Sequence, residues 1–182
     1  MGQGGGQITL GANTRVLAEV SVMVALAVVL NALRLYTLPQ GGSITIGEMV
    51  PILFLALRRG VRVGIFAGAI FGIIDIYFEP YAFSPIQFLL DYPIAFGALG
   101  LAGFLKQRGT FLSAVGAAFG VGCRFLSHFV SGIVFFAINA APGENPVLYS
   151  AVYNATYLIP GLVISELIII VLVRNGALRF RI

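Results

Sequence analysis

Charge is the scarcest property of this sequence. Only 10% of its 182 residues are charged, whereas 59% are hydrophobic and the mean hydropathy is +0.99. Soluble domains carry roughly a quarter charged residues, so this chain lacks the polar surface that a water-soluble globule needs. The composition therefore excludes an ordinary soluble domain. It predicts a multi-pass membrane protein, with the lipid bilayer as its solvent.

Residues with distinctive chemistry are also few, since the chain has one cysteine, one histidine and no tryptophan. The lone Cys123 excludes an intrachain disulfide and any multi-cysteine metal site, and a single histidine argues against zinc. No glycine-rich loop ends in Lys-Ser/Thr and no Gly-x-Ser-x-Gly occurs, so neither ATP binding nor a nucleophile elbow is indicated. We therefore expect no metal and no cofactor in this chain, and neither an ATPase nor a nucleophile-elbow hydrolase.

Apolar runs separated by turn residues predict six transmembrane helices, at about 20 residues for each span. The runs cover residues 17–35, 44–57, 61–78, 85–105, 110–138 and 147–173. A Gly- and Gln-rich stretch predicts a flexible tail at 1–13, followed by one transmembrane domain at 14–176 and a basic cytoplasmic tail at 177–182. The expected fold class is an all-α integral membrane protein.

Basic residues gather at alternate ends of the predicted spans, which sets the orientation. With the N-terminus inside, the cytoplasmic side receives Arg15, Arg58, Arg59, Arg62, Lys106, Arg108, Arg174, Arg179 and Arg181. Only Arg34 falls in an outer loop, while Arg124 lies within a span. Both termini are therefore expected in the cytoplasm. The positive charge reports orientation and gives no reason to expect nucleic acid as a partner.

Most of the acidic residues lie on the opposite side of the predicted membrane, in its outer half. Glu48, Asp75, Glu79, Asp91 and Glu144 fall in the outer half, which is net −3 as five acids minus the two bases Arg34 and Arg124. An outward-facing pocket in this half would favour a cation or a hydrogen-bond-donating heterocycle. Glu19 and Glu166 lie near the cytoplasmic boundary, where pairing with Arg15 or Arg174 is the simplest expectation.

One stretch of the fifth span, Cys123–Phe136, carries a polar face inside an apolar run. Arg124, His128, Gly132 and Phe136 recur every four residues and share one side of a helix. Ionisable groups within a membrane span usually face a cavity or a partner. We interpret this face as the wall of a ligand site.

Other polar residues reach the same depth at about 1.5 Å of rise per helical residue. They are Asp91 of the fourth span, Tyr149 and Asn154 of the sixth, and Glu48 near the outer start of the second. Together they describe a polar small-molecule site. A plainer alternative is that Arg124 and Asp91 form a buried ion pair that only fixes helix register. His128, Tyr149, Asn154 and Phe136 could likewise serve packing alone.

Two strings resemble a known family. Gly41-Gly-Ser-Ile-Thr-Ile-Gly-Glu-Met-Val-Pro-Ile-Leu-Phe-Leu-Ala-Leu-Arg-Arg-Gly60 and Gln87-Phe-Leu-Leu-Asp-Tyr-Pro-Ile-Ala-Phe-Gly97 are similar to segments of the thiamine-specific S-components of energy-coupling factor (ECF) transporters. The Arg-x3-His-x3-Gly-x3-aromatic spacing and Tyr149-Ser-Ala-Val-Tyr-Asn154 extend the resemblance over about residues 14–173. It implies a six-helix subunit of the cell (plasma) membrane that captures the vitamin from outside and performs no chemistry of its own. It also implies a shared transmembrane coupling subunit and two ATPase subunits as partners, and these partner subunits use the ATP.

The resemblance also implies roles for single residues. Asp91 stands where the family uses a glutamate to hold the aminopyrimidine, Arg124 stands at a lysine position, and Phe136 replaces a tryptophan that stacks on the thiazolium. His128, Gly132, Tyr149 and Asn154 match the pattern directly, and Tyr81 falls where an outer-loop tyrosine lies near the ligand. The family's Ala-x-x-x-Ala coupling motif has a near match in Ser21-Val-Met-Val-Ala25. The glycine-rich loop at 37–47 is a plausible lid.

Three alternatives remain open on the sequence. The site could serve another small vitamin or a related pyrimidine. The chain could be a stand-alone carrier that uses Asp91, Arg124 and His128 as a proton relay. It could also be an intramembrane enzyme with His128 as general base. Tight binding of thiamine without turnover would separate the S-component from the last two.

Overall fold

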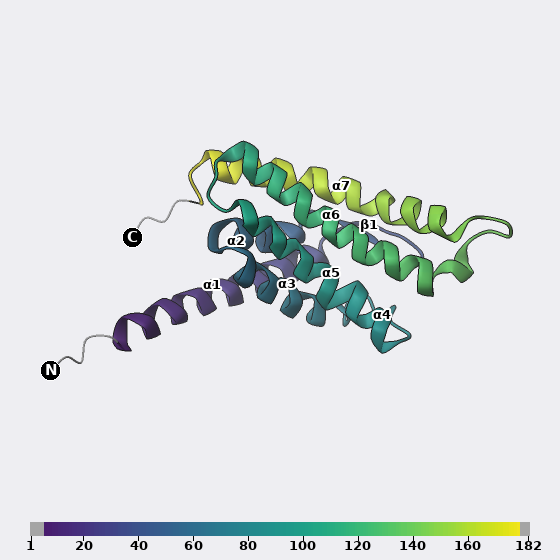
Figure 1. Ribbon diagram of the computed structural model, residues 1–182, viewed down its shortest axis with the longest axis horizontal. Coiled ribbons are helices and arrows are strands. Elements are labelled where there is room, and N and C mark those ends of the chain that lie inside the picture. The colour runs from purple at the N-terminus through teal and green to yellow at the C-terminus, as the bar shows by residue number, and fades with distance from the viewer. Residues whose placement is uncertain (1–5, 179–182) are drawn as a thin grey trace.

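The computed structural model describes residues 6–178, with side chains from residue 14 onward, and is helical apart from one short hairpin. Its six helical segments are α1 (Gly6–Ala32), α2 (Met49–Arg59), α3 (Val61–Asp75), a fourth helix (Pro85–Leu105), α6 (Thr110–Phe135) and α7 (Pro146–Arg174). In Figure 1, α6 and α7 run side by side, and α1 projects from the bundle. The predicted tail at 1–13 is described only from Gly6, where α1 begins. Arg179 and Arg181 of the predicted basic tail lie outside the described residues.

A two-stranded antiparallel hairpin corrects the all-α prediction. β1 (Arg34–Thr37) pairs with β2 (Ser43–Thr45), with Thr37 opposite Ser43. The predicted second span was therefore wrong in starting at residue 44, because α2 begins at Met49. Residues 43–46 alternate polar and apolar side chains, which is the period of a strand. Gly47 then adopts a φ of +125°, which favours glycine and separates strand from helix.

The core of the bundle is α2, whose residues from Met49 to Leu57 are all buried. A helix that is apolar on every side is stable only when other helices surround it. α2 contacts α1, α3, the fourth helix, α6 and α7. It is only 11 residues long and α3 only 15, both shorter than the about 20 residues of a full span. Within the described residues, four segments are long and apolar enough to cross a membrane: Thr14–Ala32 of α1, Pro85–Leu105, Thr110–Phe135 and Pro146–Arg174.

Backbone irregularity is concentrated in the fourth helix. It runs as α4 (Pro85–Leu89), a π-helical turn η1 (Leu90–Ile94), α5 (Ala95–Ala98) and a 3₁₀ segment η2 (Leu99–Leu105). Pro93 has no N–H to donate, so a regular α-helical ladder cannot pass through this turn. π turns inside helices are frequent at functional sites. This one carries Asp91.

Glycine stripes allow the neighbouring helices to approach the fourth helix closely. A Cβ on Gly68 or Gly72 of α3 would collide with the carbonyl oxygen of Phe96 or Tyr92. On α6, Gly116 and Gly120 face fourth-helix carbonyls in the same way. Close approach of this kind is the usual role of small residues between membrane helices. The glycines of both helices therefore serve packing inside the molecule.

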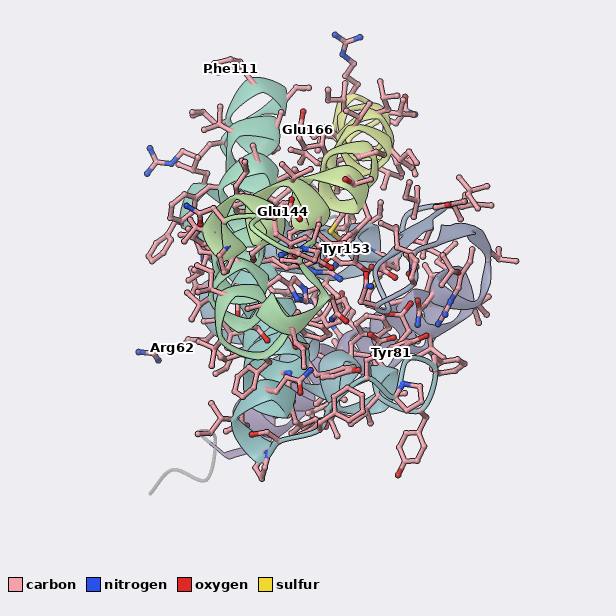
Figure 2. The ribbon with its side chains drawn as sticks, turned by 90° about the vertical axis from the view of Figure 1, so that its right-hand side faces the viewer. Arg62, Tyr81, Phe111, Glu144, Tyr153 and Glu166 are labelled. Carbon is pink, nitrogen blue, oxygen red and sulfur yellow. The ribbon has the colours of Figure 1, made fainter. Side chains whose placement is uncertain are left out.

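Basic side chains gather at one end of the bundle, near the α2–α3 turn and the start of α6. Glu19 binds Arg59 in a bidentate pair, with both distances 2.6 Å, and lies 3.6 Å from Arg58. The expected pairing of Glu19 with Arg15 or Arg174 is therefore wrong. The α6–α7 loop and the hairpin lie at the opposite end, hereafter the hairpin end (Figure 1). Figure 2 looks onto that end, with Arg62 pointing away from the bundle.

Candidate functional site

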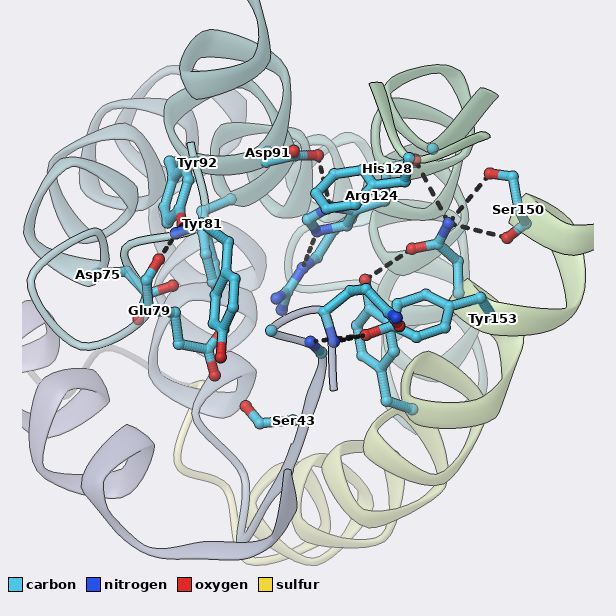
Figure 3. Close-up of a pocket in the computed structure, with 18 of the residues that line it drawn as sticks. Ser43, Asp75, Glu79, Tyr81, Asp91, Tyr92, Arg124, His128, Ser150 and Tyr153 are labelled. Atoms are coloured by element: carbon cyan, nitrogen blue, oxygen red, sulfur yellow. Dashed lines mark hydrogen bonds and ion pairs between the residues drawn. The ribbon is translucent and has the colours of Figure 1, made fainter. Parts of the chain in front are cut away.

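A cavity opens below the hairpin, bounded by α2, α3, the fourth helix, α6 and α7. The empty space between its lining atoms and at its open mouth amounts to about 700 Å³. All nine predicted ligand residues line this single cavity: Glu48, Tyr81, Asp91, Arg124, His128, Gly132, Phe136, Tyr149 and Asn154. The structure thus brings together side chains from four helices and a loop (Figure 3). Their roles in binding remain predictions.

A row of charged and polar side chains crosses the cavity from α2 to the fourth helix. Arg124 Nη1 lies 3.1 Å from Glu48 Oε1, and Arg124 Nε donates to His128 Nε2 at 3.3 Å. His128 Nδ1 lies 3.2 Å from Asp91 Oδ1, and Ser131 Oγ donates to Asp91 Oδ2 at 2.7 Å. We refer to Glu48, Arg124, His128 and Asp91 as the polar row. Arg124 therefore pairs with Glu48, and the alternative in which it pairs with Asp91 is wrong.

The Arg124 guanidinium is stabilised from two directions. Its Cζ lies 3.9 Å from the centroid of the Phe96 ring, and the Glu48 carboxylate faces its edge. Both members of this ion pair are nearly buried, with 6% and 7% of their side chains exposed. A buried charge is retained only with such partners, so breaking the pair on one side would be costly.

The α7 side of the cavity is an aromatic ladder. Tyr149 stacks on Tyr153 with ring centroids 6.0 Å apart, and Tyr153 meets Tyr157 edge to face at 6.0 Å. The amide of Asn154 is used within the protein: Nδ2 donates to the Ser150 carbonyl at 2.9 Å, and Oδ1 accepts from Tyr157 Oη at 2.8 Å. Asn154 thus holds the ladder in place and lines the cavity at the same time.

The hairpin loop covers the cavity. Tyr153 Oη lies 3.2 Å from the backbone nitrogens of both Gln40 and Gly42 and accepts hydrogen bonds from them. Gly41, at a φ of +95°, packs against the Tyr81 ring, and Gly42 packs against Tyr157. A side chain at either glycine would collide with a ring. The loop is therefore held by contacts with three tyrosines.

Two further acids line the side of the cavity nearest α1. Asp75 accepts from Asn31 Nδ2 at 2.5 Å, and Glu79 lies 3.1 Å from Arg34. Burial raises the pKa of the Glu79 carboxyl in its loop, and nearby Glu48 raises it further, while Arg34 lowers it. With Glu48 and Asp91, the cavity is bordered by four carboxyl groups and one guanidinium, that of Arg124. The arrangement favours a cationic ligand.

Sequence reasoning missed several lining residues. It selected Tyr149 but not Tyr153 and Tyr157, although their four-residue spacing places all three on one helix face. It counted Asp75 and Glu79 as acids of the outer half without assigning them to the site. No local pattern indicated Phe96, whose ring reaches the cavity only because the fourth helix packs against α6.

Comparison with known proteins finds similarity to thiamine transporters over nearly the whole chain. A family described as Thiamine transporter protein matches residues 17–180. The thiamine transporter ThiT of Bacillus subtilis is 34% identical over 171 aligned positions, covering 86% of this chain and 88% of that protein. The ThiT of Lacticaseibacillus paracasei is 28% identical over 155 positions, covering 76% and 77%.

The chain belongs to the thiamine transporter family. The structure of ThiT from Listeria monocytogenes superposes with a TM-score of 0.80 at 24% identity, covering 91% of this chain and 97% of that one, so the fold is shared. As a member of a transporter family it is a transport protein and not an enzyme. With several apolar helices long enough to span a bilayer, it is a multi-pass protein of the plasma membrane.

The predicted coupling residues of this thiamine-transporter-family protein lie apart from the cavity. Ser21 and Ala25 are both exposed on α1, and Ser21 Oγ donates to the Leu17 carbonyl at 3.0 Å. Leu17, one turn before Ser21, and the adjacent Val22 are also more than half exposed, at 56% and 64%. Lipid or a partner helix could cover this face. The docking role of Ser21 and Ala25 stays a prediction.

Proposed function

We propose that this protein is the substrate-binding S-component of an ECF importer and captures thiamine in the cavity below the hairpin. The observation that carries the proposal is the convergence of all nine predicted ligand residues on one cavity. Thiamine is a cation with an aminopyrimidine, and the cavity offers carboxylates together with aromatic faces. Asp91 accepts from the pyrimidine amine, while tyrosine rings and Phe136 lie beside the thiazolium.

Energy for release comes from partners in this proposal. The chain docks through the Ser21–Ala25 face to a shared transmembrane coupling subunit, and two ATPase subunits bind the ATP. This chain itself holds no cofactor. Membership of the thiamine transporter family and the exposed small residues on α1 support this part of the proposal.

The proposed topology has six membrane-crossing helices with both termini in the cytoplasm. The cluster of Arg58, Arg59 and Lys106 at one end of the bundle supports it, since basic residues favour the cytoplasmic side. The hairpin end then faces the outside, where the vitamin arrives. The helices α2 and α3 are both short: α2 crosses as a buried element of the bundle, whereas α3 buries one face and exposes Ile65, Phe66 and Ile73.

Titration of the purified chain with thiamine tests the proposal directly. We expect saturable binding with one thiamine per chain and no chemical change of the ligand, measured by calorimetry and by recovery of intact thiamine. A panel of free pyrimidines and other small vitamins tests whether the site serves a different ligand. Absence of binding by thiamine and by its close analogues would refute the thiamine assignment.

A stand-alone proton-coupled carrier is the second candidate, because the polar row forms a continuous hydrogen-bonded path. Liposomes that contain only this chain distinguish the two. A carrier would accumulate thiamine when a pH gradient is imposed, whereas an S-component binds thiamine and accumulates it only after the energising module and ATP are added.

A further inference from the structure

The chemistry of arginine fixes the direction of the hydrogen bonds in the polar row. A guanidinium carries five N–H donors and no acceptor, so Arg124 Nε can only donate to His128. His128 Nε2, 3.3 Å away, must therefore offer its lone pair. In a neutral imidazole with a free Nε2 the proton is on Nδ1. The geometry thus selects one of the two neutral tautomers.

The selected tautomer also matches the hydrogen-bonding requirement of Asp91, the other neighbour of the His128 ring. Nδ1–H faces Asp91 Oδ1 at 3.2 Å, which is a donor opposite an ionised acceptor. Ser131, which is fully buried, donates to the second oxygen of the same carboxylate at 2.7 Å. Asp91 is then held by two hydrogen bonds from α6, and its remaining lone pairs are free to accept from a ligand in the cavity.

The alternative protonation states of His128 fit poorly. A proton on Nε2 would place a donor against the Arg124 donor and leave the Asp91 carboxylate without its bond from the ring. A doubly protonated ring would add a second positive charge beside a guanidinium already held in place by Glu48 and Phe96. Both states lose the hydrogen bond of 3.3 Å between Arg124 and the ring.

We propose that Arg124 is a positioning residue, which fixes His128 as the neutral Nδ1–H tautomer so that the ring donates to Asp91. In this role Arg124 acts on ligand binding through His128. The consequence for thiamine rests on the proposed function, whereas the tautomer itself does not. The inference also gives a reason for the Glu48 carboxylate, which holds the guanidinium in the orientation that directs Nε at the ring.

Nitrogen-15 NMR can read the tautomer directly, because His128 is the only histidine of the chain. The protein is labelled with ¹⁵N-histidine, carries a purification tag without histidine and is measured in detergent at neutral pH without ligand. We expect Nδ1 to give the shift of a protonated ring nitrogen and Nε2 that of an unprotonated one. An Nε2–H tautomer or an imidazolium in the unmodified protein would overturn the proposal.

Substitutions of Arg124 and Glu48 test whether Arg124 sets the tautomer of His128. Arg124→Met alone would leave Glu48 buried and unpaired, so it is combined with Glu48→Gln, and Glu48→Gln alone is the control. We expect the control and Arg124→Lys, which retains a donor, to keep the Nδ1–H tautomer. The double variant should lose it and show a tautomer mixture. An unchanged spectrum in the double variant would contradict the role of Arg124.

Thiamine titration of the same variants connects the tautomer to the ligand. Relative to Glu48→Gln, we expect the double variant to bind thiamine about tenfold more weakly or worse, the scale of one hydrogen bond to a charged group. Equal affinity despite a changed tautomer would overturn the link between His128 and the ligand. If the unmodified protein does not bind thiamine, the proposed function fails while the spectra still decide the tautomer.

Discussion

Asp91 carries more of the proposed recognition than any other single residue. Its carboxylate accepts hydrogen bonds from Ser131 and faces His128, yet it still lines the cavity. The π-helical turn at Leu90–Ile94 gives it an unusual backbone position, and Ser127 Oγ supports that turn by donating to the Leu90 carbonyl at 2.6 Å. A charged acceptor held in this way is suited to the amino group of a pyrimidine.

Replacing the Asp91 carboxylate tests this role. Asp91→Asn keeps the size of the side chain but removes the charge, and hydrogen bonds to charged groups contribute about 1.5–3 kcal/mol. We expect thiamine affinity to fall about tenfold or more in calorimetric titration. Ser113→Ala is the control, since this buried hydroxyl donates to the Gly109 carbonyl at the start of α6 and does not line the cavity. Unchanged affinity in Asp91→Asn would remove Asp91 from the site.

Gly132 shows how closely α6 and α7 approach at the cavity. A Cβ there would collide with Ser150 Oγ and lie 3.3 Å from Asn154 Nδ2, the group that holds the tyrosine ladder. We expect Gly132→Ala to destabilise the protein by about 1–3 kcal/mol, the usual cost of overpacking, and to weaken thiamine binding. Thermal unfolding in detergent measures the first effect and titration the second.

Gly122 provides the matched control on the same helix. It is exposed, and a Cβ there would meet nothing within 4 Å. Gly122→Ala should leave binding unchanged and should not lower thermal stability, because alanine is the better helix former. Equal effects of the two substitutions would show that helix propensity, not contact with α7, controls position 132.

Among the elements of the fold, the hairpin loop is bound directly to α7. Two backbone N–H groups of the loop bind a single hydroxyl, that of Tyr153, and two glycines allow the loop to lie against tyrosine rings. We therefore expect these contacts to open when a ligand enters or leaves the cavity.

Removing the Tyr153 hydroxyl should loosen the lid. We expect Tyr153→Phe to accelerate thiamine dissociation about five- to thirtyfold, because two hydrogen bonds are lost and each contributes about 0.5–1 kcal/mol. Stopped-flow chase with unlabelled thiamine measures the rate. Tyr36→Phe, on the exposed strand β1 with 61% exposure, is the control and should leave the rate unchanged. A dissociation rate that Tyr153→Phe leaves unaltered would argue against this latch.

The exposed face of α1 makes a separate prediction. Ser21→Leu or Ala25→Leu adds bulk where a partner helix would need to approach, so co-purification with a coupling subunit should be lost while thiamine binding is spared. Thr156→Leu on α7 is the matched control, because Thr156 is also an exposed hydroxyl that donates to the carbonyl four residues earlier. Loss of co-purification in the control as well would show that the effect is not specific to α1.

For the whole molecule, orientation follows from the separation of charge between the two ends. In a Cys123→Ser background, Glu144→Cys in the α6–α7 loop should react with a membrane-impermeant maleimide in intact cells. Arg108→Cys, beside the start of α6, should react only after permeabilisation. The reverse pattern would place the hairpin end in the cytoplasm and contradict capture of thiamine from outside.

The sequence predicted the long helices well and the short elements poorly. The fourth and sixth segments, 85–105 and 147–173, agree with Pro85–Leu105 and Pro146–Arg174 to within a residue at each end. Their starts are marked by Ser84 and Asn145, whose side chains accept from the backbone two residues ahead, followed in each case by proline. The hairpin was missed because its pairing is formed between residues separated by a glycine turn, and apolar Ile44 and Ile46 were assigned to a helix.

Sequence by itself determined that lipid is the solvent, where the long helices lie, and which polar residues are buried at the same depth. These follow from composition and from the regular rise of a helix, which are local properties. Tertiary structure alone decided the partners: Arg124 with Glu48 and not with Asp91, Glu19 with Arg59, and Tyr153 with the hairpin loop. Such contacts depend on the rotation and spacing of helices. Glycine contacts and the π turn at Asp91 set this rotation and spacing, and both features form only in the packed bundle.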